Sequence, residues 1–302
     1  SADVREPHIK PVLRLIAAQL AEHPDVEFSG GKPSSPPRWD RFVLADQVEP
    51  VPSWAMIYWD AGTVSEAPLV MQTWQQHGVQ TILVFSRADD HEAAKAFLDQ
   101  LITQATGPRS PYRGRLLKAA WGGSGVLLDV LPDPTEHRER LILPAAVWDA
   151  LDLNVHRMFS RMDAFRTAGL GSNRGVLLAG PPGTGKTAAC KVLAREVLGG
   201  VTAIFVDSKT GQGLLPQLYS EISGMAPALV LLEDLDLLVG ARHDGSARYA
   251  LFDFLTVLDG LMTQHQDVVT VATTNDPEAV DAGVRRAARF DRADRMPDGQ
   301  PV

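Results

Sequence analysis

Apolar residues recur at helical spacing in three parts of the chain. Val12, Leu13, Ile16 and Leu20 predict a helix over residues 8–23, and Pro24 ends the run. The apolar residues of 90–106 share one face and predict an amphipathic helix, and those of 144–165 predict another helix. The chain therefore contains at least three helices with one side to bury.

Short apolar runs predict strands in the first half of the chain. Residues 54–59 and 81–85 are strand-like, and a helix is predicted around 69–77 between them. Residues 114–131 predict two strands joined around the glycine-rich stretch 121–125, which is typical of a hairpin. Alternating strands and helices indicate an α/β layer for this half.

The second half repeats strand and helix more regularly. Strands are predicted at 175–179, 203–206, 229–232, 268–273 and 293–296, and helices at 188–198 and 247–262. Such repeats indicate a parallel sheet with helices on both faces. The polar segment 132–140 separates the halves. We therefore predict an N-terminal α/β domain over 1–140 and a second α/β domain over 141–302.

Composition narrows the class of protein. Of 302 residues, 45% are hydrophobic and 22% are charged, as in a soluble globular protein. The net charge of −8 argues against nucleic acid as a partner, because phosphate backbones attract clustered Lys and Arg. The one cysteine, Cys190, allows no intramolecular disulfide, so we expect a reducing compartment, the cytoplasm. We find no secretory signal and no apolar run long enough to span a bilayer.

The first half offers no catalytic constellation. Residues 89–92, Asp-Asp-His-Glu, stand together, but at a helix start they are typical of capping rather than of metal binding. Six tryptophans lie between residues 39 and 148. They either belong to the core or form an exposed recognition surface.

The clearest chemical motif follows the predicted strand 175–179. Its eight residues have the form G-x-x-x-x-G-K-T and are Gly180, Pro181, Pro182, Gly183, Thr184, Gly185, Lys186 and Thr187. The glycines let backbone N–H groups surround phosphate oxygens, and the helix that begins at Ala188 adds partial positive charge. Lys186 would reach the β- and γ-phosphates, and the Thr187 hydroxyl would bind Mg²⁺. The stretch predicts a phosphate-binding loop.

Two more motifs follow in order. The strand 229–232 ends in Glu233 and Asp234, and the strand 268–273 leads to Thr274 and Asn275. An arginine-rich segment, 285–292, comes next. Together with the loop, these motifs resemble the AAA ATPases over about residues 153–297. The resemblance implies the parallel sheet of a P-loop NTPase, ATP and Mg²⁺ as cofactors, and ATP hydrolysis as the activity.

The resemblance also implies roles for single residues. Glu233 would hold Mg²⁺, Asp234 would polarise the attacking water, and Asn275 would sense the γ-phosphate. Arg286 and Arg289 match the arginine fingers, which in this family reach the nucleotide of a neighbouring subunit and stabilise its developing charge. The implied assembly is a ring, a hexamer. The alternative is that these arginines belong to a solvated basic face.

The sequence departs from the family in three places. The family usually has Asp then Glu where this chain has Glu233 then Asp234, although a branch that resembles the mitochondrial Rieske-protein translocase shares the swap. The shorter base puts the rate of hydrolysis in question. Residues 211–216 lack an aromatic pore residue, so Leu214 and Leu215 either face a pore or begin the next helix. The chain ends where a helical lid would begin, so we expect weaker nucleotide binding and poorer assembly than with a lid.

One expectation and two alternatives follow. We expect Mg²⁺-dependent ATP hydrolysis coupled to remodelling of a protein or complex that residues 1–140 select. The first alternative is a nucleotide-gated scaffold that assembles without productive turnover. The second makes residues 1–140 an enzyme or ligand domain that the ATPase regulates, which the lack of a catalytic motif there disfavours.

Overall fold

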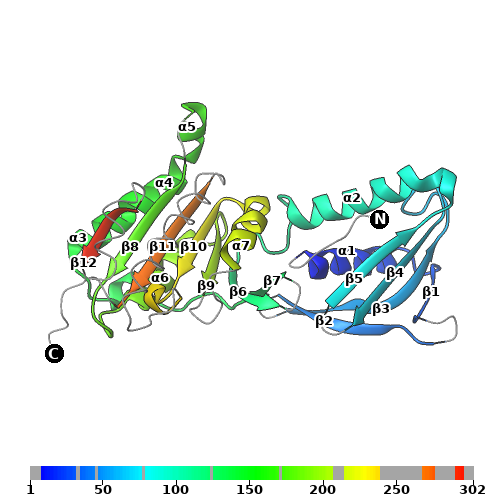
Figure 1. The fold of residues 1–302 in the computed structure, drawn as a ribbon, viewed down its shortest axis with the longest axis horizontal. Coiled ribbons are helices and arrows are strands. Elements are labelled where there is room, and N and C mark those ends of the chain that lie inside the picture. Colours follow the sequence, from blue (N-terminus) through cyan, green and yellow to red (C-terminus); the bar gives the residue numbers. More distant parts are fainter. Residues whose placement is uncertain are drawn as a thin grey trace, which may run out of the picture. The chain divides into compact units, whose positions relative to one another are not determined.

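The computed structural model describes residues 8–31, 35–44, 47–76, 79–122, 125–169, 172–206, 214–238, 267–275 and 290–295 (Figure 1). By its contacts the chain divides into two compact units. Unit 1 comprises Ser1–Pro111 and Gly122–Leu127, and unit 2 comprises Tyr112–Trp121 and Leu128–Val302. The described residues form two sheets, one of five strands and one of seven.

Unit 1 is built on an antiparallel sheet. Its strands are β1 (Glu27–Ser29), β2 (Arg38–Leu44), β3 (Gln47–Trp59), β4 (Leu69–Gln76) and β5 (Val79–Phe85). They follow the order β1-β3-β4-β5, and β2 also pairs with the long strand β3. The predicted helices are present as α1 (Ile9–Glu22) and α2 (His91–Thr106). The helix α1 packs on β3 and β5, and α2, which follows the short turn η1 (Ala88–Asp90), packs on α1 and β5.

The helix predicted at 69–77 is wrong, because these residues form β4. Leu69, Met71 and Thr73 are 2%, 0% and 0% exposed, so every second side chain points into the core. The Thr73 hydroxyl fits there because it donates to Pro52 O at 2.9 Å and accepts from the Ala55 N–H at 3.1 Å. This half is therefore an antiparallel sheet with helices rather than an α/β layer.

Unit 2 contains the predicted parallel sheet. Its strands are β6 (Leu116–Gly122), β7 (Gly125–Val130), β8 (Arg174–Ala179), β9 (Thr202–Val206), β10 (Ala228–Leu232), β11 (Val268–Thr274) and β12 (Phe290–Arg295). They follow the order β12-β8-β11-β10-β9-β6-β7, and the pairs from β12 to β6 are parallel. The strands β9, β10 and β11 are buried along their whole length. A sheet buried on both faces explains their uninterrupted apolar sequences.

The two strands predicted within 114–131 are present as β6 and β7, which pair with each other, and β6 extends the sheet of unit 2. Leu116, Leu117, Lys118 and Ala119 of β6 pair in parallel with Ala203–Val206 of β9. Leu116 and Leu117 are 3% and 0% exposed, so β6 belongs to the buried sheet. The division by contacts therefore falls after Pro111, whereas the sequence placed it at residue 140.

Helices complete unit 2. The predicted helix 144–165 is divided into α3 (Ala145–Leu151), the π-helical turn η3 (Asp152–His156), α4 (Arg157–Ser160) and α5 (Met162–Thr167). Other helices among the described residues are η2 (Arg138–Arg140), α6 (Lys186–Val197), α7 (Leu214–Ile222), η5 (Ser223–Met225) and α8 (Leu235–Leu238). The core joins α3, η3 and α6 to the sheet through Leu151, Val155 and Leu193. The predicted helix 247–262 lies outside the described residues.

A cluster of charged side chains joins η2 to η3 and α6. The Arg138 guanidinium donates to both oxygens of Asp152, at 2.7 and 2.8 Å, and to both oxygens of Glu196, at 2.8 and 2.9 Å. It also lies over the Trp148 ring, 4.4 Å from its centroid. The hydrogen bonds from Arg138 hold the pKa of Asp152 below its usual value. Asp152 belongs to η3 and Glu196 to α6, so one side chain fastens three elements.

None of the helices that the structure describes is both long enough and apolar enough to cross a bilayer.

Candidate functional site

The motif of residues 180–187 joins β8 to α6, in the strand–loop–helix context that it needs. The Gly180 N–H donates to Thr274 O at 3.3 Å, which fastens the start of the loop to the end of β11. Gly183 and Gly185 have φ of +82° and +90°, a left-handed conformation that favours glycine. Gly185 is also the N-cap of α6, so the first N–H groups of the helix face the loop.

Lys186 is buried within this loop. It is 6% exposed, and its Nζ donates to Gly180 O and to Pro181 O, each at 2.7 Å. The Thr184 hydroxyl donates to Pro181 O at 2.9 Å and braces the same turn. The ammonium group is thus held at the N-terminal end of α6, where the helix dipole is also positive, and the loop attracts anions.

Two leucines that the motif does not include lie against the loop. A Cβ atom on Gly185 would lie 3.1 Å from Leu141 Cδ1 and 3.7 Å from Leu143 Cδ2. These leucines give the loop an apolar side. An apolar surface can contact an uncharged aromatic ring, whereas it offers a charged phosphate no hydrogen bond. They could not be predicted from the sequence, because a pair of leucines just before a predicted helix carries no signal of its own.

The predicted acidic residues lie where β10 ends, next to the ends of its neighbours. The Glu233 N–H donates to Val206 O at 3.0 Å, which holds it beside the end of β9. The Asp234 N–H donates to the Thr273 hydroxyl at 3.0 Å, and the Asn275 Nδ2 donates to Asp234 Oδ1 at 2.9 Å. The structure therefore brings Asp234 and Asn275 into contact, although 41 residues separate them.

Asp234 has an unusual backbone conformation. Its φ of +50° is in the left-handed region, which is uncommon for residues with a side chain. Such a conformation costs about 1 kcal/mol and persists where surrounding contacts hold it, often at functional sites. The bonds to Thr273 and Asn275 fulfil that condition here. Thr273 was not singled out from the sequence, since its role depends on the neighbouring strand.

Glu233 and Thr187 are the predicted Mg²⁺ ligands. Thr187 is exposed at the second position of α6. Glu233 lines the same pocket as Lys191 of α6. Burial raises the pKa of the Cys190 thiol, and the charge of Glu233 raises it further. No group of three or more His, Cys, Asp or Glu side chains within the described ranges could hold a metal ion. Mg²⁺ at a phosphate site needs only one or two side chains, because phosphates and water complete its shell.

The remaining predicted residues are placed as follows. Pro181 and Pro182 lie in the loop, and Ala188 lies in the first turn of α6. Arg286 and Arg289 lie outside the described residues, and so do residues 211–213 of the stretch that lacks the pore aromatic of the family. Leu214 and Leu215 begin α7, and Leu215 is 1% exposed. Of the two alternatives for these leucines, the structure supports the start of the helix.

Comparison with known proteins identifies the second half of unit 2. Residues 176–298 match the family described as "ATPase family associated with various cellular activities (AAA)". The chain is 36% identical over 143 residues to "ATPase family gene 2 protein homolog B" of Bos taurus. It is 32% identical over 139 residues to "Cell division cycle protein 48 homolog" of Archaeoglobus fulgidus, and 34% identical over 141 residues to "Nuclear valosin-containing protein-like" of Mus musculus.

These similarities concern one domain. Each covers 43% of this chain, but only 18%, 19% and 16% of the respective relative. The family match begins within β8 and includes the loop, both acidic residues and Asn275. The order of motifs, the parallel sheet and the matches agree: residues 176–298 form a domain of the AAA ATPase family, whose members bind and hydrolyse ATP.

Proposed function

We propose that this chain binds ATP in the loop 180–187 and hydrolyses it with the help of Mg²⁺. The observation that carries the proposal is that the loop 180–187, Glu233 and the bonded pair Asp234–Asn275 follow the carboxyl ends of three adjacent parallel strands. Ligands of open α/β sheets bind at that edge. The AAA match over the same residues supports a nucleoside triphosphate as the ligand.

Binding would rearrange the lysine. Lys186 exchanges its bonds to the Gly180 and Pro181 carbonyl groups for bonds to phosphate oxygens, which carry full negative charge and bind an ammonium group more strongly. The N–H groups at the start of α6 bind the same phosphates. Leu141 and Leu143 cover the apolar side of the loop, where they can contact the adenine ring.

Hydrolysis would depend on the acidic edge. Thr187 and Glu233 hold Mg²⁺, which supplies charge neutralisation when bound. Asp234 accepts a hydrogen bond from the attacking water and orients it. Asn275 fixes the Asp234 carboxylate through its bond to Oδ1. This bond compensates in part for the short side chain, because a fixed carboxylate needs less reorganisation than a mobile one.

The wider role is proposed from the family and the architecture. AAA proteins typically form oligomers, and Arg286 and Arg289 would complete the site of the next subunit in a hexameric ring. Unit 1 would select a protein or complex that the ATPase remodels. We place the protein in the cytoplasm because its one cysteine, Cys190, is buried and unpaired.

The proposal is tested by measuring ATP hydrolysis and ATP binding in the wild type and in Asp234→Asn. We expect steady Mg²⁺-dependent phosphate release by the wild type, and a loss of about 10²-fold or more in Asp234→Asn with ATP still bound. Tight binding without turnover in the wild type would instead support the nucleotide-gated scaffold. Failure to bind ATP would contradict both.

A further inference from the structure

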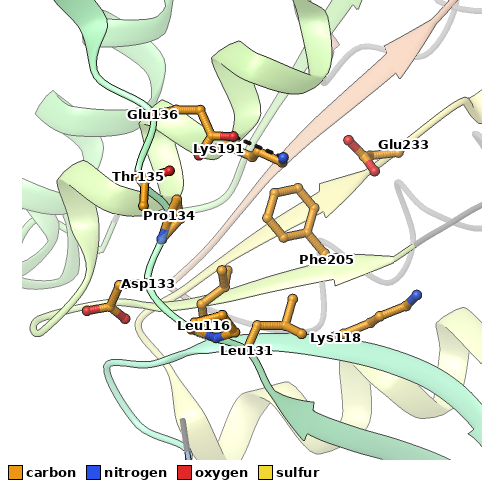
Figure 2. A pocket seen from close by; sticks show the side chains of 11 residues that line it. Leu116, Lys118, Leu131, Asp133, Pro134, Thr135, Glu136, Lys191, Phe205 and Glu233 are labelled. Atoms are coloured by element: carbon orange, nitrogen blue, oxygen red, sulfur yellow. Dashed lines mark hydrogen bonds and ion pairs between the residues drawn. The ribbon is translucent and has the colours of Figure 1, made fainter. Parts of the chain in front are cut away.

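A cavity in unit 2 has the predicted site residue Glu233 in its wall. It has a volume of about 550 Å³ and is an open pocket lined by residues of β6, β9, α6 and the segment that follows β7. Figure 2 shows the Phe205 ring in this pocket, with Leu116 and Leu131 on one side and the pair Lys191–Glu136 on the other. A cavity of this size is typical of sites for small molecules.

The cavity is distinct from the phosphate loop. None of residues 180–187 lines it, and among the described residues Glu233 is the only predicted site residue in its wall. Lys191 lies four residues beyond Thr187 on α6, about one helical turn further from the loop. Leu116, Leu131 and Glu136 precede residue 176, where the AAA match begins. Most of this pocket is therefore supplied by sequence outside the matched domain.

The lining determines which ligand fits. Leu116 and Phe205 are 3% and 9% exposed and give an apolar floor with one aromatic ring, against which a second flat ring can stack. At the rim, Lys191 Nζ donates to Glu136 Oε1 at 3.0 Å. That hydrogen bond lowers the pKa of Glu136, so the rim presents a carboxylate acceptor beside an ammonium donor. A heteroaromatic ring with an amino group next to a ring nitrogen matches this donor–acceptor edge.

We propose that this pocket binds a small heteroaromatic ligand of the aminopurine kind, stacked on Phe205 and hydrogen-bonded to Glu136 and Lys191. The ligand would lie beside Glu233, which also lines the pocket. Its binding would therefore change how Glu233 holds Mg²⁺, and the pocket would regulate the ATPase. This regulatory part rests on the proposed function, whereas binding itself does not.

Fluorescence titration of the free base 2-aminopurine into the nucleotide-free protein tests binding. Stacking quenches this probe, and we expect saturable quenching with a Kd of about 1 mM or tighter, as for a ligand of roughly ten heavy atoms. Leu131→Phe adds volume inside the pocket and should weaken binding by about tenfold or more. Leu153→Phe is the matched control, because Leu153 is 50% exposed and lines no part of this pocket.

Two further variants separate this site from the nucleotide site. Lys191→Met removes the rim donor with little change in length and should also weaken 2-aminopurine. Leu141→Ala trims the apolar side of the phosphate loop, where we place the adenine ring of ATP, and should leave 2-aminopurine binding unchanged. The proposal is overturned if quenching does not saturate, if Leu131→Phe binds as the wild type does, or if Leu141→Ala abolishes binding.

The regulatory part has its own readout. With 2-aminopurine bound, the Mg²⁺ concentration for half-maximal ATP hydrolysis should shift about twofold or more in the wild type and in Leu153→Phe, but not in Leu131→Phe. An identical Mg²⁺ requirement with and without the base would rule out regulation. If the protein binds 2-aminopurine yet hydrolyses no ATP, the proposed function fails and the pocket remains.

Discussion

The contact between Asn275 and Asp234 lets the catalytic assignment be tested as a pair. If Asn275 acts mainly by orienting the Asp234 carboxylate, removing either residue removes the same contribution. We expect Asn275→Ala and Asp234→Asn each to lower kcat by about 10²-fold, and the double variant to be hardly slower than Asp234→Asn alone. ATP affinity should change little in all three. Multiplying effects would show that Asn275 acts on the nucleotide independently of Asp234.

Gly185 has a positive φ and a close neighbour. Each of these two features disfavours a residue with a side chain at this position. Its φ is +90°, and a Cβ atom would lie 3.1 Å from Leu141 Cδ1. We expect Gly185→Ala to lower the free energy of unfolding by roughly 1–3 kcal/mol and to weaken ATP binding, since Leu141 must move. Gly200→Ala is the matched control, because nothing lies within 4 Å of its Cβ position and its φ is ordinary. Urea denaturation and nucleotide titration of both variants measure the difference.

At the level of elements, the Arg138 cluster fastens η2 to η3 and α6, the helix that begins at the phosphate loop. Arg138→Met removes the charge but keeps a chain that can still cover Trp148. We expect a loss of about 1–3 kcal/mol in the free energy of unfolding at neutral pH, because Asp152 and Glu196 lose their cation. Arg140→Met, an exposed change in the same turn, should be neutral.

The same pair of variants has a predictable pH dependence. The folded-state pKa of Asp152 is lowered, so its stabilisation is complete above its unfolded pKa and is lost as the pH falls through the folded value. The stability difference between the wild type and Arg138→Met should therefore shrink below about pH 4. Urea midpoints compared at neutral and acidic pH measure it. A constant difference would mean that packing on Trp148, rather than charge, accounts for the loss.

Some secondary-structure elements could be predicted from the sequence, and others could not. The strands β9, β10 and β11 could be predicted because they are buried on both faces. Such strands have uninterrupted apolar sequences, which elements with one face in solvent lack. The strand β4 was taken for a helix because Leu69, Met71 and Thr73 alternate with residues of mixed polarity, and the partner of Thr73 lies on β3. The loop 180–187 and the acidic residues Glu233 and Asp234 could be proposed from the sequence, since each motif is a short run of consecutive residues. The contacts of Leu141 and Thr273 could not, because they depend on tertiary structure.

At the scale of the whole molecule, β6 connects the two halves of the sequence. It precedes the predicted boundary at residue 140 but pairs in parallel with β9 of the sheet of unit 2. Without β6, the edge of β9 would lose its partner, and an unpaired apolar edge promotes aggregation. A chain that begins at Tyr112 should therefore remain monodisperse in size-exclusion chromatography. A chain that begins at Leu141 should aggregate, and equal behaviour of the two would contradict a structural role for β6.

The proposed ring makes a prediction that no single subunit can show. Lys186→Ala should inactivate its own loop while keeping its arginines, and Arg289→Ala should keep its loop while losing the arginine that serves the neighbour. Each variant alone should be inactive. If the arginine acts on the next subunit, mixing equal amounts restores sites in which an intact loop meets an intact arginine. For random assembly, about a quarter of the sites recover, so the ATPase rate should approach that fraction of the wild-type rate. Arg292→Ala in place of Arg289→Ala is the matched control, since it should be active alone. If the mixture stays as inactive as its components, Arg289 acts within its own subunit or has no catalytic role.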